Sequence, residues 1–520
     1  MQRRELRDGM KLKVKCIGLE IGGKPIVILN SEDAGDLGIH SSARVRVQHG
    51  KKIITAIVNV ATKIVAKGNI GVSDEAKMQL SLKGNEEVEV EVAKFPSSLQ
   101  FIKNKLNGRK LNYEEIFGIV KDTVEGNLNE SEIAAFVTAL YTKGVDIDEA
   151  ASLTCAMVET GKTLKLDKKI IVDKHSVGGT VGDKTTMLVV PIVASLGLTI
   201  PKTSSRAITS PAGTADKAEV LMPVELSIEE MKDVVEKTNG CIVWGGALSL
   251  APADDIFIRV EYPLSIDPLM FPSIMAKKKA VGANHLVIDI PTGRGTKVKT
   301  IGDADLLAKD FIELGKRLKI KTQCAITYGE QPIGYTIGPA LEVKEMLEVI
   351  MRKRNVVDVV DKACHIADIL LKMTGKEQKA LEVLKSGKAE EKLREIIAQQ
   401  GGNAAVKPED IEIGDYGLDI CADRGGYVLW INNTGFADVA RAAGAPKDKG
   451  AGVLLHKKLG FKVEKGERLF TVYAEKARKL ERVRKITEEN GIMGVGDRVE
   501  MLIHEVKEVP VHKKSFMLER

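Results

Sequence analysis

The sequence has few cysteines, no long hydrophobic run and little excess of either charge. Six cysteines are scattered over 520 residues, and no two of them form a CxxC pair. This spacing excludes a CxxC site and indicates buried, reduced thiols in a reducing compartment. No stretch of about 18 uncharged apolar residues is present, which excludes a membrane-spanning helix. The charged start, MQRRELRDGMKLKVK, lacks the apolar segment of a signal peptide, so we expect a cytoplasmic protein.

The charge and the composition also limit the class of partner. The formal net charge is +6, which is too small a basic excess for a nucleic-acid-binding surface but suits anionic small substrates. No nucleic-acid or membrane partner is therefore expected. Hydrophobic residues make up 44% of the chain, which is ample for packed cores. At roughly 100–200 residues per domain, the length predicts three or four domains.

The hydrophobic pattern changes along the chain and predicts an α/β multidomain protein. Residues 1–92 alternate apolar and polar positions, as in ARVRVQHG and EEVEVEVAKF, which predicts an N-terminal β-rich domain. Residues 97–167 have apolar residues at helical spacing, with a cap at Asn129, and predict a small all-α domain. The proline-rich, partly helical segment of about 250–283 is expected to join this helical domain.

Strands alternate with helices over residues 168–249 and 284–424. KKIIVDKHS, LTIPKTSSR and HLVIDIPTGRG each have the pattern of a buried strand followed by a polar loop. This alternation predicts a large α/β domain with a mainly parallel sheet and helices on both faces. Residues 425–510 are strand-rich again and predict a compact C-terminal α+β domain, in which only ADVARAAG has a helical pattern.

The loop after the first predicted α/β strand, KHSVGGTVGDKTT, has the composition of an anion-binding site. Gly178 and Gly179 allow the backbone to approach a ligand closely, and a helix is expected to begin at Gly182 and Asp183. The free N–H groups of that helix, together with Lys174 and nearby hydroxyl groups, favour a phosphate. Asp183 would repel an anion, so we expect it to cap the helix. The GxxxxGK[ST] spacing of a P-loop is absent.

Two further groups of polar residues are expected at the same edge of the sheet. KTSSRAITSPAGTADKAEVL contains five hydroxyl side chains within eleven residues, and its Arg206 suits phosphate or carboxylate oxygens. The alternative is a set of turn residues, with Thr214 or Asp216 capping the next helix. The other group lies in IRVEYPLSIDPLMFPSIMAKKKA and IPTGRGTKVK, where solvated charges or helix caps are the alternative. Its candidates are Arg259, Asp267, Ser273, Lys277 and Lys297.

The motifs KHSVGGTVGDKTT and SSRAITSPAGTADKAE together resemble the signature of the thymidine/pyrimidine nucleoside phosphorylase family. SIMAKKKAVGANHLVIDIPTGRGTKV and GGYVLWINNTG resemble later blocks of that family, so the resemblance covers about residues 97–505. The β-rich domain and the VEYPLSIDP block resemble the archaeal AMP phosphorylase branch. The resemblance implies a helical, an α/β and a C-terminal domain, usually paired as a homodimer. Assembly beyond the dimer, through the N-terminal domain, stays open.

The resemblance also implies a reaction. Inorganic phosphate would attack the anomeric carbon of a nucleoside 5′-monophosphate, giving ribose 1,5-bisphosphate and free base in nucleotide degradation or salvage. AMP is the expected substrate, with CMP and UMP as further substrates. No cofactor is implied, because phosphate is itself the co-substrate. The positions that match the family's phosphate cradle are Lys174, Ser176, Gly179, Thr186, Ser204 and Thr214.

The remaining matches concern the nucleotide and the leaving base. Asp267 matches a general acid that protonates the base, and an Asp-Pro turn at Pro268 is the structural alternative. Arg206 and Lys297 are the candidates for the 5′-phosphate. The positions that match nucleotide contacts are Ser205, Arg206, Ala207, Ile208, Thr209, Ser210, Arg259, Ser273, Lys277 and Lys297.

Three alternatives stay open at the level of sequence. A pyrimidine nucleoside phosphorylase would act on thymidine or uridine, whereas an anthranilate-type phosphoribosyltransferase would need phosphoribosyl pyrophosphate and Mg²⁺. A catalytically inactive nucleotide sensor would bind without turnover. Asp254 and Asp255 form an acidic pair of the kind that such transferases use for magnesium. However, APADDIFIRVE resembles the phosphorylase block at that place, and no metal is expected.

Overall fold

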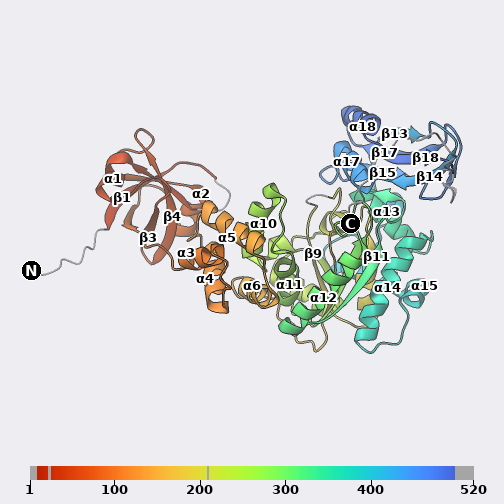
Figure 1. Ribbon diagram of the computed structural model, residues 1–520, viewed down its shortest axis with the longest axis horizontal. Helices are drawn as coiled ribbons and strands as arrows, with labels where there is room; N and C mark the ends of the chain where they lie inside the picture. The colour runs from red at the N-terminus through yellow and green to blue at the C-terminus, as the bar shows by residue number, and fades with distance from the viewer. Residues whose placement is uncertain (1–8, 21–24, 208–209, 498–520) are drawn as a thin grey trace, which may run out of the picture.

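The computed structural model describes residues 9–20, 25–207 and 210–497, and its parts form an elongated row (Figure 1). A β-barrel lies at one end, a helical bundle comes next, and a sheet flanked by helices follows. A smaller C-terminal part of strands and helices lies at the other end. This architecture confirms the predicted multidomain α/β fold class.

The N-terminal part is a closed six-stranded barrel accompanied by two short helices, α1 (Ser31–Asp36) and α2 (Asp74–Leu80). Its strands are β1 (Met10–Cys16), β2 (Ile26–Asn30), β3 (Arg44–His49), β4 (Lys52–Ala61), β5 (Asn69–Val72) and β6 (Glu87–Val92). They pair in the order β1-β5-β2-β4-β3-β6. The alternating sequence explains the barrel, because Val45 and Val47 are buried in its core while Arg46 between them is exposed. Closure leaves no unpaired strand edge.

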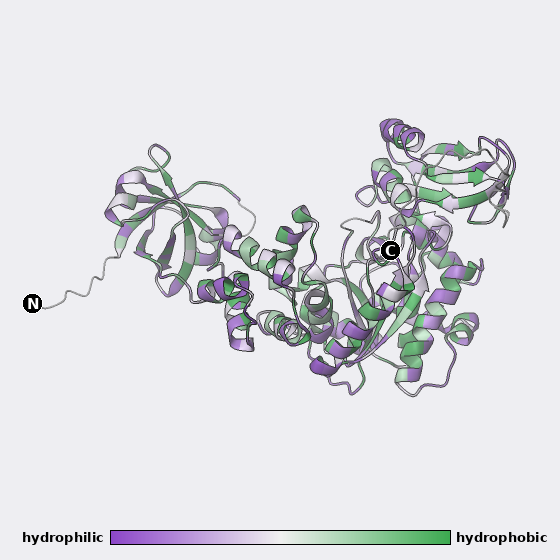
Figure 2. Ribbon diagram, in the orientation of Figure 1, coloured by the Kyte–Doolittle hydropathy of each residue, from purple (hydrophilic) through white to green (hydrophobic). Residues whose placement is uncertain are grey.

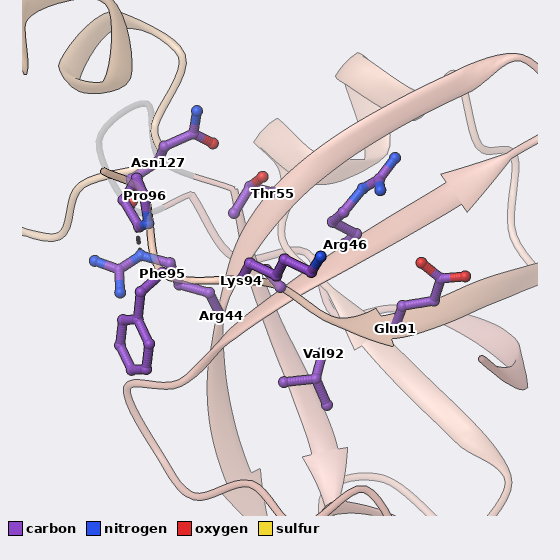
Figure 3. Close-up of a pocket in the computed structure, with 10 residues that line it drawn as sticks. Arg44, Arg46, Thr55, Glu91, Val92, Lys94, Phe95, Pro96 and Asn127 are labelled. Carbon is purple, nitrogen blue, oxygen red and sulfur yellow. Dashed lines mark hydrogen bonds between the residues drawn. The ribbon is translucent and has the colours of Figure 1, made fainter. Parts of the chain in front are cut away.

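A buried arginine attaches the barrel to the helical bundle. Arg44, at the start of β3, is only 6% exposed. Its Nε donates a hydrogen bond to the backbone oxygen of Asn127 at 2.6 Å, and its guanidinium forms an ion pair with Glu132. Beside it, a pocket of about 450 Å³ opens between β3, β4, β6 and residues 93–96 (Figure 3). Because the charge of Arg44 is buried and paired, the barrel is held by more than the connecting chain.

The helical bundle is built from helices whose starts are capped by polar residues. It contains α3 (Ser98–Leu106), α4 (Tyr113–Val124), α5 (Glu130–Lys143), α6 (Ile147–Glu159), α10 (Pro252–Leu264) and α11 (Met270–Ala280). Asn112, Asn129 and Asp146 form capping boxes with a glutamate three residues later. The predicted cap at Asn129 is confirmed. Helix α10 packs against α4 and α5, and α11 packs against α6, so segments far apart in sequence form one bundle.

The strands of the central sheet are β7 (Val172–Ser176), β8 (Ile200–Ser204), β9 (Gly240–Trp244), β10 (His285–Thr292) and β11 (Lys321–Tyr328). The accompanying helices are α7 (Thr185–Ser195), α8 (Thr214–Ala218), α9 (Ile228–Thr238), α12 (Ile301–Leu318), α13 (Pro339–Ile350), α14 (Val357–Met373), α15 (Ala380–Ser386) and α16 (Lys388–Gln399). Strands β11, β10 and β7 pair in that order, and β8 pairs with β9. A bridge between Ile171 and Thr199 connects the two sets, and all of these pairings are parallel.

Both faces of the sheet are covered by helices, as predicted. Val287 of β10 packs in the core formed with α7 and α14, whereas its neighbours Leu286 and Ile288 pack in the core formed with α12. Figure 2 shows hydrophobic residues concentrated along these strands and hydrophilic residues on the outer helices. The parallel arrangement places the carboxyl ends of the strands at one edge, where loops are free to bind ligands.

The C-terminal part contains two sheets formed by β12 (Thr336–Ile337), β13 (Tyr416–Cys421), β14 (Gly426–Ile431), β15 (Gly452–Leu455), β16 (Lys462–Val463), β17 (Arg468–Ala474) and β18 (Met493–Gly496). Its helices are α17 (Asn433–Ala443) and α18 (Arg478–Glu489). Helix α17 contains most of the segment ADVARAAG, but the prediction of a single helix is wrong because α18 is helical too. Val483 of α18 is buried, and Leu480 and Ile486, three residues before and after it, are half-buried against the same core. None of the helices within the described ranges has the length and hydrophobicity that a bilayer-spanning segment needs.

Candidate active site

The candidate loops follow parallel strands and therefore start from one edge of the sheet. Strands β7, β8 and β10 end at Ser176, Ser204 and Thr292. Because the strands run in the same direction, these ends lie at the same edge. The predicted phosphate-site residues Lys174 and Ser176 lie on β7, and Ser204 is the last residue of β8. The fold thus brings residues from separate motifs together.

Lys297 connects the loop after β10 with the loop after β7. A Cβ atom added at Gly178 would lie 2.6 Å from the Cβ of Lys297, so the two loops are in contact. The Lys297 ammonium forms an ion pair with Asp267, which lies between α10 and α11. The candidate general acid, the candidate 5′-phosphate ligand and the predicted phosphate loop are therefore neighbours.

Lys174 is a buried cation without an ion-pair partner within the described part of the chain. It is 2% exposed, and its Nζ donates a hydrogen bond to Ser176 Oγ at 2.9 Å. Burial lowers the pKa of Lys174, although the charges of Asp183 and Asp289 oppose this effect. A buried ammonium group that lacks a direct counter-ion is costly unless a bound anion compensates it. The surroundings of Lys174 are therefore suited to an anion.

Three residues that support Ser176 were not predicted from the sequence. Asp289, inside β10, is fully buried, and its Oδ2 accepts a hydrogen bond from Ser176 Oγ at 2.6 Å. Its Oδ1 accepts one from Thr327 Oγ1 at 2.6 Å, and Lys362 Nζ lies 2.9 Å from Oδ2. The sequence does contain one signal, because an aspartate within the apolar run HLVIDIP needs buried partners. Those partners lie on β11 and α14, far along the chain.

His175 lies on β7 between Lys174 and Ser176, at the same edge of the sheet. Burial lowers its pKa well below the ordinary value, and the neighbouring charges of Lys278 and Lys202 lower the pKa further. The imidazole is therefore neutral at physiological pH. The imidazole therefore adds no positive charge to the site, and the charge comes from the neighbouring lysines.

The loop between β7 and α7 contains glycines in left-handed conformations. Gly178 has φ +76° and lies against Lys297, so any side chain there would be strained and would collide. Gly179 has φ +48°, and no atom lies within 4 Å of a Cβ built on it, which leaves open space beside the backbone. The hydroxyl group of Thr180 is buried and has no hydrogen-bond partner among the described residues. It is a further donor for a bound anion.

Helix α7 begins later than predicted. Its first residue is Thr185, whereas the sequence predicted a start at Gly182 and Asp183. Lys184, not the predicted Asp183, occupies the N-cap position, although Asp183 Oδ1 does accept a hydrogen bond from the Thr185 N–H at 2.9 Å. Thr186, a predicted phosphate ligand, is buried in the first turn.

In the second loop, Arg206 is surrounded by carboxylates. Its guanidinium donates hydrogen bonds to Glu219 at 2.6 Å and to Glu225 at 2.8 Å, and it lies over the ring of Trp244. These bonds raise the pKa of Arg206 and lower that of Glu219 to about 2. The structure therefore gives Arg206 local partners, and its role as a nucleotide contact stays a prediction.

Asp216 binds two backbone N–H groups in the rest of the second loop. Its Oδ2 accepts hydrogen bonds from the N–H groups of Ala207 at 2.7 Å and Gly213 at 2.9 Å, so Asp216 is the capping residue that the sequence offered as an alternative. Thr214 is the first residue of α8. Ser205 is exposed and Ser210 is half-buried. The predicted contacts Ile208 and Thr209 lie outside the described residues.

The nucleotide candidates on the helical bundle differ in their surroundings. Arg259 is exposed on α10, and Ser273 lies in the first turn of α11. Lys277 Nζ is 2.7 Å from Asp254 Oδ2; burial alone would lower the pKa of Lys277, but Asp254 raises it. Asp254 is thus engaged with a lysine. Across the described residues, no group of three or more histidine, cysteine or acidic side chains is placed to hold a metal ion.

Glu261, on α10, is a buried carboxyl group that the sequence did not single out. Its Oε1 accepts a hydrogen bond from the N–H of Leu269 at 3.1 Å, which holds the segment that carries Asp267. Burial raises the pKa of Glu261 to about 7, and the charge of Asp267 contributes. The ordinary pKa of 4.5 applies in the unfolded chain. The free energy of unfolding that the neutral Glu261 carboxyl group contributes is therefore fully present below pH 4.5. It is lost as the pH rises through about 7, where the group ionises in the folded protein.

Replacing Glu261 by glutamine should remove this pH dependence. Glutamine keeps the Oε1 acceptor but cannot ionise. The free energy of unfolding of the variant, measured relative to that of the parent protein, should therefore increase from pH 5 to pH 8. The expected gain is about 2–3 kcal/mol, since one pKa unit corresponds to about 1.4 kcal/mol. Urea unfolding at both pH values measures it, with Glu229→Gln, an exposed glutamate on α9, as the control. An equal pH response of parent and Glu261→Gln would contradict the prediction.

Comparison with known proteins finds family models for the helical, the α/β and the C-terminal parts of the chain. The family models that match are the helical bundle domain of the glycosyl transferase family over residues 99–161 and its a/b domain over 168–390. The pyrimidine nucleoside phosphorylase C-terminal domain matches residues 427–492. A crystal structure of anthranilate phosphoribosyltransferase from Thermus thermophilus covers 58% of this chain and 99% of its own, with TM-score 0.50 and 18% identity. That likeness concerns the fold alone.

Relatives with much higher identity extend over nearly the whole chain. AMP phosphorylase of Thermofilum pendens is 49% identical over 98% of this chain and 100% of its own length. AMP phosphorylase of Pyrococcus furiosus is 50% identical over 91% of this chain and 95% of its own. An alignment over 98% of the chain includes the N-terminal barrel, which the family models leave out. The chain therefore belongs to the glycosyl transferase family with a pyrimidine nucleoside phosphorylase C-terminal domain, within the group of the AMP phosphorylases.

Proposed function

We propose that the protein catalyses the phosphorolysis of nucleoside 5′-monophosphates. Inorganic phosphate attacks the anomeric carbon of AMP, and the products are ribose 1,5-bisphosphate and adenine, in nucleotide degradation or salvage. Relatives named AMP phosphorylase at about 50% identity support AMP as the substrate over an unphosphorylated pyrimidine nucleoside. CMP and UMP are proposed as further substrates.

The observation that carries the proposal is the buried ammonium of Lys174. It lies on β7, at the edge where ligands bind in such sheets, with Ser176 as its hydrogen-bond partner and no carboxylate paired to it in the described ranges. Phosphate is already a nucleophile, so the protein needs to position it and to stabilise the developing charge rather than to activate it. We propose that Lys174, Ser176, Gly179, Thr186, Ser204 and Thr214 form the phosphate site.

We further propose that Asp267 is the general acid and that Lys297 binds the 5′-phosphate. In the structure these two side chains pair with each other. A dianionic 5′-phosphate would draw Lys297 away from Asp267, which leaves the carboxyl group free to carry the proton for the leaving base. The remaining nucleotide contacts are proposed to come from residues 205–210, Arg259, Ser273 and Lys277. This exchange of partners gives a physical reason for a preference for nucleotides over nucleosides.

The proposal is tested by base release from the full chain with phosphate and, in turn, AMP, CMP, UMP, adenosine, uridine and thymidine. Release from AMP but not from adenosine supports it. Faster release from uridine or thymidine would instead indicate a nucleoside phosphorylase. Turnover only with phosphoribosyl pyrophosphate and Mg²⁺ would indicate a transferase, and AMP binding without any turnover would indicate a sensor.

Replacing Lys297 by methionine should affect nucleotides selectively. The variant loses one charge-assisted contact with the 5′-phosphate, so we expect KM for AMP to rise about 10- to 100-fold. Any residual turnover of adenosine, which lacks that phosphate, should not fall. Steady-state kinetics with both substrates measures the difference, and Lys299→Met, which removes an exposed lysine two residues away, is the control. Equal losses for AMP and adenosine would rule out the assigned role.

We propose that the protein acts in the cytoplasm as a homodimer, in line with the resemblance of its helical and α/β parts to a dimeric family. The proposed domains are residues 1–92, residues 97–167 with about 250–283, residues 168–249 with 284–424, and residues 425–510. Sedimentation of the full chain and of a chain without the barrel would show whether the barrel drives assembly beyond the dimer.

A further inference from the structure

Charges of both signs, all buried except the half-buried Asp183, lie near the proposed phosphate site, and the cations and anions are equal in number. The cations are Lys174, Lys217 and Lys362, and the anions are Asp183, Asp289 and Glu342. Lys217 pairs with Glu342 at 2.8 Å and also donates a hydrogen bond to the backbone oxygen of Asp183. This leaves the carboxylates of Asp183 and Asp289 to be compensated by Lys362 or by Lys174.

Lys362, on α14, forms ion pairs with the carboxylates of both Asp183 and Asp289. Its Nζ lies 2.9 Å from Asp289 Oδ2 and 3.3 Å from Asp183 Oδ2. Burial alone would lower the pKa of Lys362, but the charges of Asp183 and Asp289 outweigh burial and raise it. Lys362 is therefore charged in the folded protein. Lys174, by contrast, pairs with neither carboxylate, although both are close enough to influence its charge.

The same cluster orients the hydroxyl group of Ser176. Ser176 Oγ donates to Asp289 Oδ2, the oxygen that Lys362 also contacts, and it accepts a hydrogen bond from Lys174 Nζ. The second oxygen of Asp289 is held by Thr327. The carboxylate of Asp289 is thus fixed on both sides, and its position sets the direction of the Ser176 hydroxyl group and of the Lys174 ammonium group.

We propose that Lys362 is a positioning residue for the attacking phosphate. It is the direct ion-pair partner of both Asp183 and Asp289, so that neither carboxylate draws the Lys174 ammonium away from the ligand and Ser176 is held in place. The inference rests on the proposed phosphate site. Without Lys362, the cluster carries one excess negative charge beside that site, and Lys174 becomes the nearest cation for both carboxylates. A phosphate dianion would then meet repulsion and would lose its main partner.

The experiment compares Lys362→Met with the parent protein in steady-state kinetics that vary phosphate and AMP separately. We expect KM for phosphate to rise about 30-fold or more, while KM for AMP changes less than about threefold, because only phosphate meets the uncompensated carboxylates. The double variant Lys362→Met/Asp183→Asn restores the charge balance. Its KM for phosphate should be at least about tenfold lower than that of Lys362→Met. Lys372→Met, an exposed lysine on the same helix, is the matched control.

The outcomes separate this inference from the function on which it rests. A selective rise in KM for phosphate with recovery in the double variant supports the inference. A uniform loss of kcat and of affinity for both substrates, without recovery, would mean that Lys362 only holds the fold. An unchanged KM for phosphate would overturn the inference while the proposed function stands. A parent protein that releases no base in the presence of phosphate would instead overturn the proposed function.

Discussion

Lys174→Met is expected to abolish phosphorolysis while the protein remains folded and able to bind AMP. The ammonium group is 2% exposed and has no ion-pair partner in the described part of the chain, so its removal leaves no carboxylate unpaired. Loss of one donor at a site of developing charge typically costs about 10²–10³ in rate, and this residue supplies a full charge as well. We therefore expect kcat/KM to fall at least about 10³-fold. Phosphate-dependent base release measures the loss, and AMP binding by calorimetry confirms an intact nucleotide site.

Lys184→Met is the informative control, because Lys184 is a second buried lysine in the same segment. Its Nζ lies 2.6 Å from Glu345 Oε2, and both side chains are fully buried. Removing Lys184 leaves the fully buried Glu345 with only the longer ion pair to Arg354, at 3.5 Å, among the described residues, so we expect this variant to lose about 3–5 kcal/mol of unfolding free energy. Lys174→Met should lose little stability, as measured by urea unfolding. An active Lys174→Met variant, or one as unstable as Lys184→Met, would contradict the assignment of the anion site.

Asp267→Asn is expected to lower kcat with little change in either KM. Asparagine has nearly the same shape but cannot deliver the proton that the leaving base needs. General acids typically contribute about 10²–10⁴ to the rate, so we expect a loss in that range for AMP. Stopped-assay measurement of adenine release gives kcat, and the separate KM values show whether binding is retained.

A substrate with a better leaving group distinguishes acid catalysis from a structural effect. The base of 7-methylguanosine 5′-monophosphate already carries a positive charge, so it departs without added protonation. The loss caused by Asp267→Asn should be at least about tenfold smaller with this substrate than with AMP. An equal loss with both substrates would show that Asp267 acts by holding the site and not by donating a proton.

The predicted loops illustrate how much of the site was readable from the sequence. The loop around Gly178 and Gly179 was identified because glycines, hydroxyl side chains and a lysine directly follow an apolar strand pattern. The start of α7 was misplaced by a few residues, because a sequence pattern does not determine the exact end of a helix. Helix α18 was missed for a different reason. Its apolar residues Leu480, Val483 and Ile486 do recur at helical spacing, but they are only three in a highly charged segment, so the repeat was overlooked.

Other parts of the site could not be read in this way. Arg206 was identified as a phosphate partner, yet three acidic residues that follow it along the chain, Asp216, Glu219 and Glu225, surround its guanidinium. Lys362 was not identified at all, because nothing near it in the sequence shows that Asp183 and Asp289 lie within reach. These contacts depend on which helix packs on which face of the sheet, and a single sequence pattern does not contain that information.

The sequence by itself determined the parallel α/β architecture, the strand-to-helix loops and the chemical character of each loop. These are properties of residues that are close together along the chain, where hydrophobic period and turn chemistry act. The tertiary structure decided which of the buried lysines already have a carboxylate and which one is left for an anion. That decision depends on segments far apart in sequence, since α14 must pack over β10 before Lys362 can pair with Asp289 and leave Lys174 without a carboxylate among the residues that the structure describes.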